Sequence, residues 1–337
     1  MRRHLVAGLS ATALLGLTAC SGSGGVTPSE TLSRSVTDGP AASEPQPEED
    51  LPPISDARLR FGLALAEGPT SDEVRRLSES LGESPAISLF FKDFAQDPPL
   101  HELDIVAARG SEPVISWEPW VWDEGVDQPE FRLDEITAGA HDDVLDEWGA
   151  ALATWGRPLT LRFGHEMNGS WYPWAESENG NGTGDYIKAF RHVHDRVKAA
   201  GADNVRWMWS PNSRSEPAAS LARYYPGDDY VDVVGLDGYN WGTTKAWSWW
   251  QKPDEIFDST LANVRTIAPG KPIILAETSS VTEGGDRKEW ARQLIEYADK
   301  QKDVSGVVWF HSEEDVDWRL DDATLSALKS ALGRRKD

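Results

Sequence analysis

The sequence predicts an α/β protein of the (β/α)8 TIM barrel class, and two features of the chain indicate this fold. Short apolar runs alternate with segments of helical periodicity from residue 58 onward. Acidic and aromatic residues stand at the carboxyl ends of many of these runs, which is where a parallel barrel gathers its functional groups. The eight runs predicted as strands are 58–65, 86–91, 113–119, 159–166, 205–211, 231–239, 272–278 and 306–311.

Helical segments separate these runs, as the connections of a parallel barrel require. Helical spacing of apolar residues is seen in the segments 71–82, 141–156, 184–201 and 286–300. Gly201 and Gly270 follow predicted helices, at the position where a helix often ends. A doubly wound open sheet is the alternative, but FGLALAEGP, which includes the end of the first run, is a poor match to the phosphate loop of such sheets.

The composition narrows the class of partner. The chain has 337 residues, 16 of them tryptophan, and a formal net charge of −23 at pH 7. This charge argues against nucleic acid, because proteins bind phosphates mainly through lysine and arginine. It also opposes electrostatic docking on an anionic membrane surface, and it fits a protein that acts on a neutral ligand. The single cysteine, Cys20, allows no intrachain disulfide, so the fold depends on its core.

The first 52 residues are predicted to lie outside the folded domain. Two arginines precede an apolar stretch, 5–17, which is too short to span a bilayer comfortably and is followed by LTAC. This pattern resembles a bacterial lipobox, so residues 1–20 are interpreted as a lipoprotein signal peptide and Cys20 as the lipidated residue. Residues 21–52, rich in Ser, Gly, Pro and Glu, are predicted to be a disordered linker.

The predicted organisation is therefore a single catalytic (β/α)8 domain, 53–337, behind a lipoprotein signal and a tether. We expect the protein to be secreted and lipid-anchored to the outside of a bacterial membrane, with membrane contact only through the lipid on Cys20. An ordinary secretory signal with a spare cysteine, or an uncleaved anchor, is the alternative. We expect a monomer.

The carboxyl ends of the predicted strands carry a set of acidic, polar and aromatic residues. These ends meet at one face of a barrel, so we expect the set to come together there. Its members are Glu118, Trp120, Glu166, Asn212, Asp237, Tyr239, Glu277, Trp309 and His311. A purely structural barrel has no reason to gather carboxylates at one end.

Glu166 and Glu277 are the strongest catalytic candidates in this set. Alternation along 159–166 turns Arg162 and Glu166 into the barrel and leaves the apolar residues facing the helices. The two glutamates end the fourth and seventh strands, which lie across a barrel from each other. Such a pair can hydrolyse a glycosidic bond, one as acid and the other as nucleophile or as base for water. A separation of about 5–5.5 Å indicates retention of configuration, and a wider one indicates inversion.

Aromatic side chains near these strand ends are candidates for stacking on the apolar faces of sugar rings. The candidates are Trp120, Trp171, Trp174, Trp209, Tyr239 and Trp309. Any one of them is more often a core residue than a sugar platform. The aromatics that follow Glu166, however, fall in a loop and are harder to bury.

Five sequence blocks, in order, resemble glycoside hydrolase family 26, which is best known for endo-β-1,4-mannanases. The blocks are RFGHEMNGSWYPW, WMWSPN, YYPGDDYVDVVGLDGYNW, KPIILAETSS and WFHSEEDVDWR, within a resemblance that covers roughly residues 58–335. The resemblance implies a (β/α)8 fold and hydrolysis with retention. The segment after the eighth strand and the loop 177–185 are less typical, so the resemblance supports the chemistry better than the substrate.

The same resemblance implies roles for individual residues. Glu166 would be the acid/base and Glu277 the nucleophile. Tyr239 would hydrogen-bond the nucleophile, and Trp309 would form the floor of the subsite for the cleaved sugar, with Trp318 contributing from the following loop. The predicted substrate-binding residues are His165, Trp171, Trp209, Tyr239, Trp309 and Trp318.

The expected function is retaining, endo-acting hydrolysis of a β-linked polysaccharide or oligosaccharide, with β-1,4-mannan as the first candidate. A mixed-linkage β-glucanase or a β-xylanase would use the same catalytic residues and stays open. A cell-surface barrel that binds carbohydrate without cleaving it also stays open. No metal or other cofactor is expected, because carboxylate acid–base and nucleophilic chemistry requires none.

Overall fold

The computed structural model describes residues 51–65, 68–69, 72–213 and 218–335. The predictions for the signal peptide, for Cys20 and for the linker up to residue 50 lie outside the described residues. At the start of the described chain, the carbonyl oxygens of Pro52 and Pro53 accept hydrogen bonds from the hydroxyl and the backbone N–H of Ser84. The compact domain accordingly starts at Leu51, two residues before the predicted boundary.

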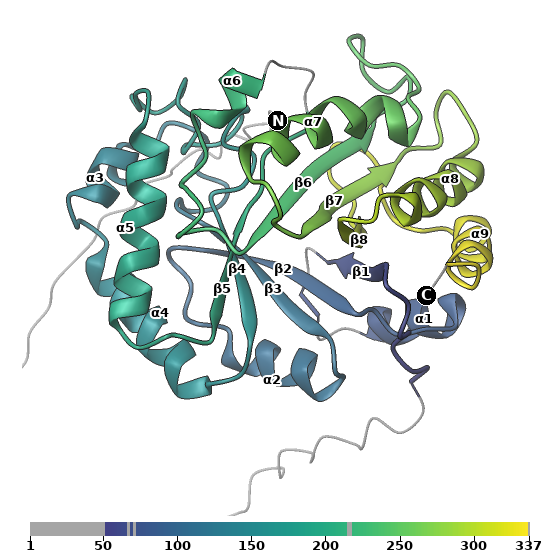
Figure 1. Ribbon diagram of the computed structural model, residues 1–337, viewed down its shortest axis with the longest axis horizontal. Helices are drawn as coiled ribbons and strands as arrows, with labels where there is room; N and C mark the ends of the chain where they lie inside the picture. The colour runs from purple at the N-terminus through teal and green to yellow at the C-terminus, as the bar shows by residue number, and fades with distance from the viewer. Residues whose placement is uncertain (1–50, 66–67, 70–71, 214–217, 336–337) are drawn as a thin grey trace, which may run out of the picture. The chain divides into compact units, whose positions relative to one another are not determined.

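Eight parallel strands form a closed barrel in sequence order (Figure 1), which confirms the predicted (β/α)8 TIM barrel. Each strand pairs with the next, and the first pairs with the last. The strands are β1 (Arg60–Ala64), β2 (Ile87–Asp93), β3 (Glu112–Glu118), β4 (Leu159–Phe163), β5 (Val205–Trp209), β6 (Val233–Asn240), β7 (Ile273–Ser280) and β8 (Val304–Phe310).

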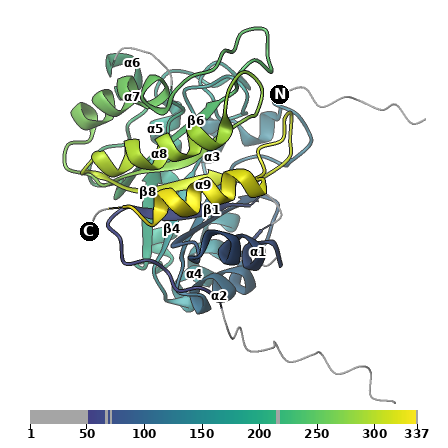
Figure 2. The same cartoon turned by 90° about the vertical axis from the view of Figure 1, so that its right-hand side faces the viewer.

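Helices surround the barrel, and α9 lies between α8 and α1, where it closes the ring (Figure 2). The helical elements are α1 (Asp72–Leu81), α2 (Leu100–Ala108), the 3-10 turn η1 (Pro129–Phe131), α3 (Leu133–Thr137), α4 (Asp142–Trp155), α5 (Asp185–Ala199), α6 (Ala218–Ala222), α7 (Pro253–Ile267), α8 (Arg287–Lys300) and α9 (Asp322–Leu332). None of the helices in the described part of the chain has the length and apolar character that crossing a membrane requires.

Strand alternation divides the apolar core into two layers. Side chains such as Val114, Met208 and Ile274 fill the inside of the barrel. Their neighbours on the strands, such as Leu161 and Leu275, pack outward against the helices. Apolar side chains thus fill the barrel below its carboxyl end, where the polar groups of the candidate site gather.

An irregularity in β7 changes the direction of one side chain at that end. Leu236 pairs with Leu275, but the next residue of β6, Asp237, pairs with Glu277. Ala276 is therefore an extra residue in β7, and the ladder with β8 shifts in the same stretch. As expected of a β-bulge, two consecutive side chains, Ala276 and Glu277, then face the barrel interior.

Candidate active site

Glu277 is held at the carboxyl end of the barrel by groups from two other strands. Arg162 of β4 donates a hydrogen bond to its Oε1. The hydroxyl of Tyr239, on β6, donates to its Oε2 at 2.6 Å, which is the contact that the family resemblance implies. With the residue only 4% exposed, both carboxylate oxygens are fixed in position by these two donors.

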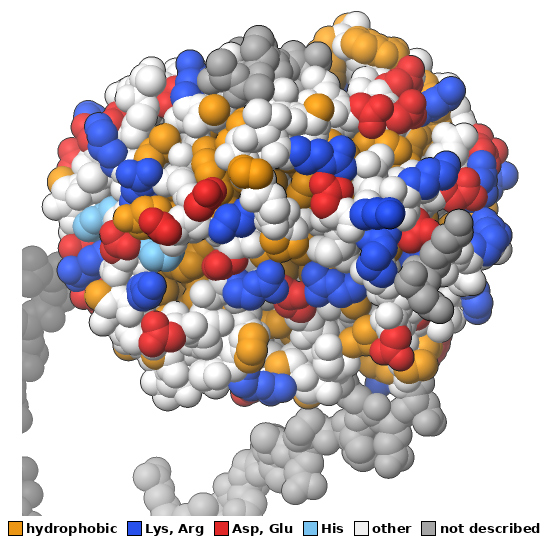
Figure 3. Space-filling view, in the orientation of Figure 1, with side chains coloured by type: hydrophobic (Ala, Val, Ile, Leu, Met, Phe, Trp, Pro, Cys, Tyr) orange, Lys and Arg blue, Asp and Glu red, His pale blue; other side chains and the backbone are white. Residues whose placement is uncertain are grey.

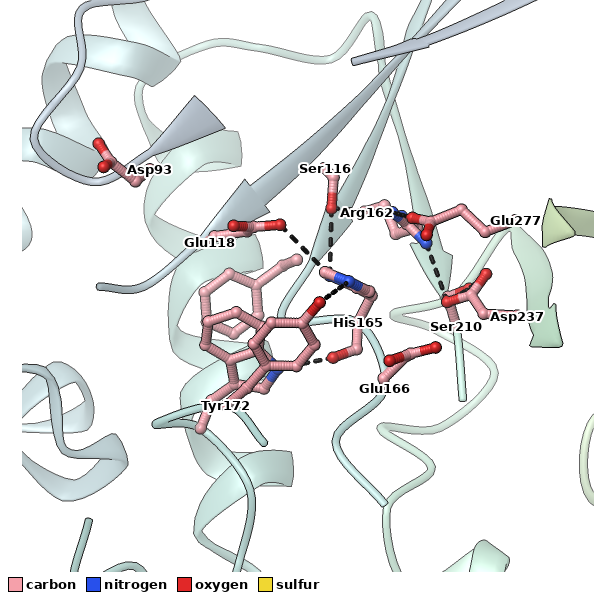
Figure 4. A network of polar contacts seen from close by, with 12 residues as sticks. Asp93, Ser116, Glu118, Arg162, His165, Glu166, Tyr172, Ser210, Asp237 and Glu277 are labelled. Carbon is pink, nitrogen blue, oxygen red and sulfur yellow. Dashed lines mark hydrogen bonds and ion pairs between the residues drawn. The ribbon is translucent and has the colours of Figure 1, made fainter. Parts of the chain in front are cut away.

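The buried guanidinium of Arg162 connects the strands that carry the polar groups (Figure 4). Besides Glu277, it donates to Asp237 Oδ2 at 2.9 Å and to Ser116 Oγ at 3.0 Å. Burial opposes the charge on Arg162, but the charges of Glu277 and Asp237 outweigh burial and raise the pKa of the guanidinium. Arg162 therefore places a permanent positive charge inside the barrel mouth, on the side that alternation predicts.

Glu166 lies in a turn after β4, so the predicted extension of this strand to residue 166 is wrong. The strand ends at Phe163, and Gly164 and Glu166 then adopt left-handed φ angles of 52° and 53°. Positive φ is uncommon for a residue other than glycine, and such strain persists where surrounding contacts impose it, often at active sites. Here the Glu166 N–H donates to the Ser210 carbonyl oxygen at 2.7 Å, which fixes the turn against the end of β5.

Burial, the charge of Glu277 and two hydrogen-bond donors together set the pKa of Glu166. Asn212 Nδ2 donates to Oε1 at 2.7 Å, and Trp171 Nε1 donates to Oε2 at 2.6 Å. Both hydrogen bonds favour the ionised carboxylate. Burial, followed by the charge of Glu277, outweighs them and raises the pKa of Glu166 to about 7. Glu166 can therefore give and accept a proton near neutral pH.

His165 is buried beside Glu166 and connects two parts of the site. Its Nδ1 lies 3.2 Å from Ser116 Oγ, and its Nε2 lies 3.1 Å from the hydroxyl of Tyr172. Burial, and then the charge of Arg162, holds its pKa well below the usual value, so the ring is neutral. With 1% exposure, His165 positions Tyr172 and has little surface of its own for a ligand.

Glu118 is a second buried acid, to which the sequence alone assigned no role. Its Oε2 accepts hydrogen bonds from the indoles of Trp120 at 2.9 Å and Trp122 at 2.8 Å, and its Oε1 lies 3.7 Å from His165 Nδ1. Burial outweighs the two indole donors and raises the pKa of Glu118 to about 7. The sequence signal for this arrangement is EPWVW, in which the two tryptophans follow the glutamate at two and four residues.

Two of the predicted sugar contacts face away from the barrel mouth. Trp309 is fully buried and packs against Trp290 of α8, with ring centroids 6.0 Å apart. Trp209 is also fully buried and packs against Tyr225 at 5.1 Å. The residue before each tryptophan fills the barrel interior, so alternation turns both indoles towards the helices. The prediction that Trp209 and Trp309 bind sugar is corrected accordingly.

Trp318 and Trp171 take other positions. Trp318 is 1% exposed and packs between Tyr239, at 5.0 Å, and Trp241, at 4.8 Å. It therefore supports Tyr239 and offers no open face, which corrects its predicted contact with substrate. Trp171 is partly buried and reaches Glu166 through its indole nitrogen.

In the described part of the chain, no group of three or more His, Cys, Asp or Glu is arranged to hold a metal ion.

The fold and these contacts can be compared with known proteins. The model of the family described as glycosyl hydrolase family 26 matches residues 126–300, a span that includes Glu166 and Glu277 and makes up more than half of the 337-residue chain. This chain belongs to glycosyl hydrolase family 26. The resemblance found in the sequence is confirmed, and the two glutamates lie in the matched region.

Two relatives are similar to this chain in sequence over most of its length. Endoglucanase H of Acetivibrio thermocellus is 34% identical over 82% of this chain and 30% of the relative. Beta-1,3-xylanase TXYA of Vibrio sp is 25% identical over 77% of this chain and 58% of the relative. This chain thus spans less than two thirds of either relative.

Similarity to the solved structure concerns the fold. The catalytic domain of the Bacillus sp. JAMB-750 GH26 Endo-beta-1,4-mannanase superposes with a TM-score of 0.64 at 20% identity. The match covers 82% of this chain and 86% of that chain. Identity at this level supports the shared barrel and carries no further conclusion about the substrate.

Proposed function

We propose that this chain is a retaining, endo-acting glycoside hydrolase that cleaves a β-linked polysaccharide. The proposal rests on the different surroundings of Glu166 and Glu277 at the same end of the barrel. Glu166 has a pKa of about 7, and Glu277 is held by Arg162 and Tyr239. Glycosidic cleavage uses such a pair, in which one carboxyl group has a pKa near 7 and the other is a carboxylate held in a fixed orientation. Membership of glycosyl hydrolase family 26 supports the proposal.

In the first step, Glu277 attacks the anomeric carbon of the sugar. The bond between this carbon and the glycosidic oxygen breaks while Glu166 donates its proton to the leaving oxygen. The product is a glycosyl ester on Glu277 and a shortened chain with a free hydroxyl. Tyr239 and Arg162 hold the attacking carboxylate in one orientation, which reduces the entropic cost of the attack.

In the second step, Glu166 acts as a base. Formation of the ester removes the charge of Glu277, which is one of the two causes that raise the pKa of Glu166. The pKa of Glu166 therefore falls in the intermediate, and the ionised carboxylate takes a proton from an attacking water. Water forms a bond to the anomeric carbon, the ester bond breaks, and Glu277 leaves as a carboxylate.

For the polymer, we propose a β-glucan first, ahead of the β-1,4-mannan expected from the sequence resemblance. The relative named an endoglucanase aligns over 82% of this chain at 34% identity. The likeness to the mannanase structure, at 20% identity, reflects the shared fold. A β-xylan is the third candidate, because the relative named a beta-1,3-xylanase aligns over 77% of this chain at 25% identity.

The test is reducing-sugar release by the full chain from mixed-linkage β-glucan, β-1,4-mannan, β-1,3-xylan, β-1,4-xylan and a soluble cellulose derivative. We expect cleavage of at least one polymer, and a loss of about a thousandfold or more in Glu277→Ala. The circular dichroism spectrum of this variant should show that it is folded at the assay temperature. Proton NMR during the reaction should show that the first sugar product has the β configuration at its new reducing end. Release of the α anomer would overturn the retaining mechanism.

Azide rescue provides an independent test of the nucleophile. In Glu277→Ala, azide should enter the space left by the carboxylate and attack the anomeric carbon of an activated aryl glycoside. The product should be an α-glycosyl azide. Cleavage of no polymer and no aryl glycoside, together with tight oligosaccharide binding, would favour the non-catalytic carbohydrate-binding barrel.

A further inference from the structure

Two tryptophans of one loop are unusually exposed. Trp247 and Trp249 are each 63% exposed, and Leu100, at 37%, is the only other large apolar side chain that is exposed among the described residues. The loop 241–252 follows β6, so it rises from the carboxyl end of the barrel, where the candidate site lies. Figure 3 shows hydrophobic side chains gathered where this loop protrudes in Figure 1. Neighbouring exposed apolar groups of this size mark binding surfaces.

A row of aromatic rings joins this loop to the candidate nucleophile. Tyr239, which donates to Glu277, lies 6.4 Å from the ring of Trp241. Trp241 in turn lies 5.5 Å from Trp247, with the two planes at 60°. The row therefore starts beside the carboxylate and ends at an exposed indole, and Trp247 is its outermost ring.

Hydrogen bonds fix the base of the loop that carries Trp247. The Asn240 carboxamide oxygen accepts hydrogen bonds from the backbone N–H groups of Gly242 at 3.3 Å and Gln251 at 3.0 Å, which clamps the two ends of the loop together. The Thr243 N–H also donates to the Glu283 carbonyl oxygen at 3.1 Å. A loop that is held at its base loses less entropy on ligand binding than a free loop does.

Polar groups stand beside the same rings. The Lys245 ammonium lies 5.6 Å from the centroid of Trp241 and pairs with Asp315 at 3.3 Å. Lysine donors and carboxylate acceptors next to an apolar ring match a sugar, which has hydroxyl groups at its edge and C–H groups on its faces. The net charge of −23 disfavours an anionic ligand or an anionic membrane surface at this position.

We propose that Trp247 is the platform of a distal sugar-binding subsite. Its exposed indole stacks on the apolar face of a β-linked hexose residue, at least one residue beyond the sugar that Glu277 attacks. This inference rests on the proposed glycoside hydrolase function and extends it to long substrate chains. Trp249 is equally exposed, but within the described residues it makes no ring contact with the row, so it lies outside the subsite.

The test compares Trp247→Ala with Trp249→Ala, a matched loss of one exposed indole from the same loop. Each is assayed on the polymer that the full chain cleaves and on a short aryl β-glycoside that ends near the cleaved bond. We expect Trp247→Ala to lower kcat/KM on the polymer about tenfold and to leave the short glycoside unchanged. Trp249→Ala should change neither. Equal losses on both substrates, equal losses in both variants, or no loss at all would overturn the proposal.

Binding separates a failure of this inference from a failure of the hydrolase proposal. Calorimetric titration of the same variants with β-linked oligosaccharides of increasing length needs no turnover. Weaker binding of only the long oligosaccharides by Trp247→Ala would support the subsite even if the protein cleaves nothing. Unchanged glycan binding, combined with reduced binding of Trp247→Ala to neutral lipid vesicles, would assign the loop to a membrane surface and overturn the proposal.

Discussion

Replacing Trp171 with phenylalanine should change the pH dependence of the reaction, because it removes one of the two donors that act on Glu166. The indole N–H of Trp171 lies 2.6 Å from Glu166 Oε2 and stabilises the ionised carboxylate. Without this donor the ionised form is less stable, so the pKa of Glu166 rises above its value of about 7. If Glu166 is the proton donor, the alkaline limb of kcat/KM moves to higher pH.

The size of the shift follows from the energy of the hydrogen bond. A hydrogen bond to a charged group contributes about 1.5–3 kcal/mol. One pKa unit corresponds to about 1.4 kcal/mol, so complete loss of this bond would move the pKa by about one to two units. Glu166 is 6% exposed, so water can replace part of the lost bond. We therefore expect a shift of about one unit.

Glu118 provides the matched control, because it has the same pKa of about 7 and is also held by two donors. Trp122→Phe removes one indole donor from Glu118 as Trp171→Phe does from Glu166. The assay is kcat/KM across pH for both variants on one soluble polymer. The alkaline limb should move in Trp171→Phe only. Movement in Trp122→Phe alone would refute the reasoning and identify Glu118 as the proton donor.

Two further predictions concern packing and charge. Trp309→Phe should lower the free energy of unfolding by about 1–3 kcal/mol and leave KM unchanged, because Trp309 packs against α8; a raised KM with unchanged stability would restore it as a sugar contact. Arg162→Met should lower stability by about 3–5 kcal/mol in urea denaturation, since it leaves Glu277 and Asp237 without their buried partner. The exposed pair of Arg265 and Asp303 is the control, and Arg265→Met should lower the free energy of unfolding by less than about 1 kcal/mol. Equal losses of stability in Arg162→Met and Arg265→Met would contradict the view that Arg162 stabilises the barrel through its buried ion pairs.

Local pattern was sufficient to predict the barrel and part of its site. Period-two alternation from Leu159 to Arg162 places the arginine inside the barrel, and the structure finds it there. Strand ends gather at one face in any parallel barrel, so Glu118, Glu166 and Asn212 were expected at the same face before their contacts were known. These features depend only on the order of residues along each strand.

Side-chain alternation along β5 and β8 also predicts that Trp209 and Trp309 face the helices, not the substrate. Val308 and Phe310 fill the barrel, so Trp309 between them must face the helices. Trp209 follows Met208 and is turned outward for the same reason. Position at a strand end makes Trp209 a candidate for sugar binding, and the family resemblance does so for Trp309, but neither criterion considers which way the side chain points from the strand.

The sequence by itself determined the order of strands and helices and placed two glutamates at the ends of strands four and seven. Only the tertiary structure decided that Glu277 faces the barrel. Strict alternation after Ile274 and Ala276 would turn Glu277 outward with Leu275, towards the helices. Pairing with both β6 and β8 instead accommodates Ala276 as an extra residue, and this rotates Glu277 onto Arg162 and Tyr239. A bulge depends on which residues face each other across neighbouring strands, and the sequence of a single strand does not contain that information.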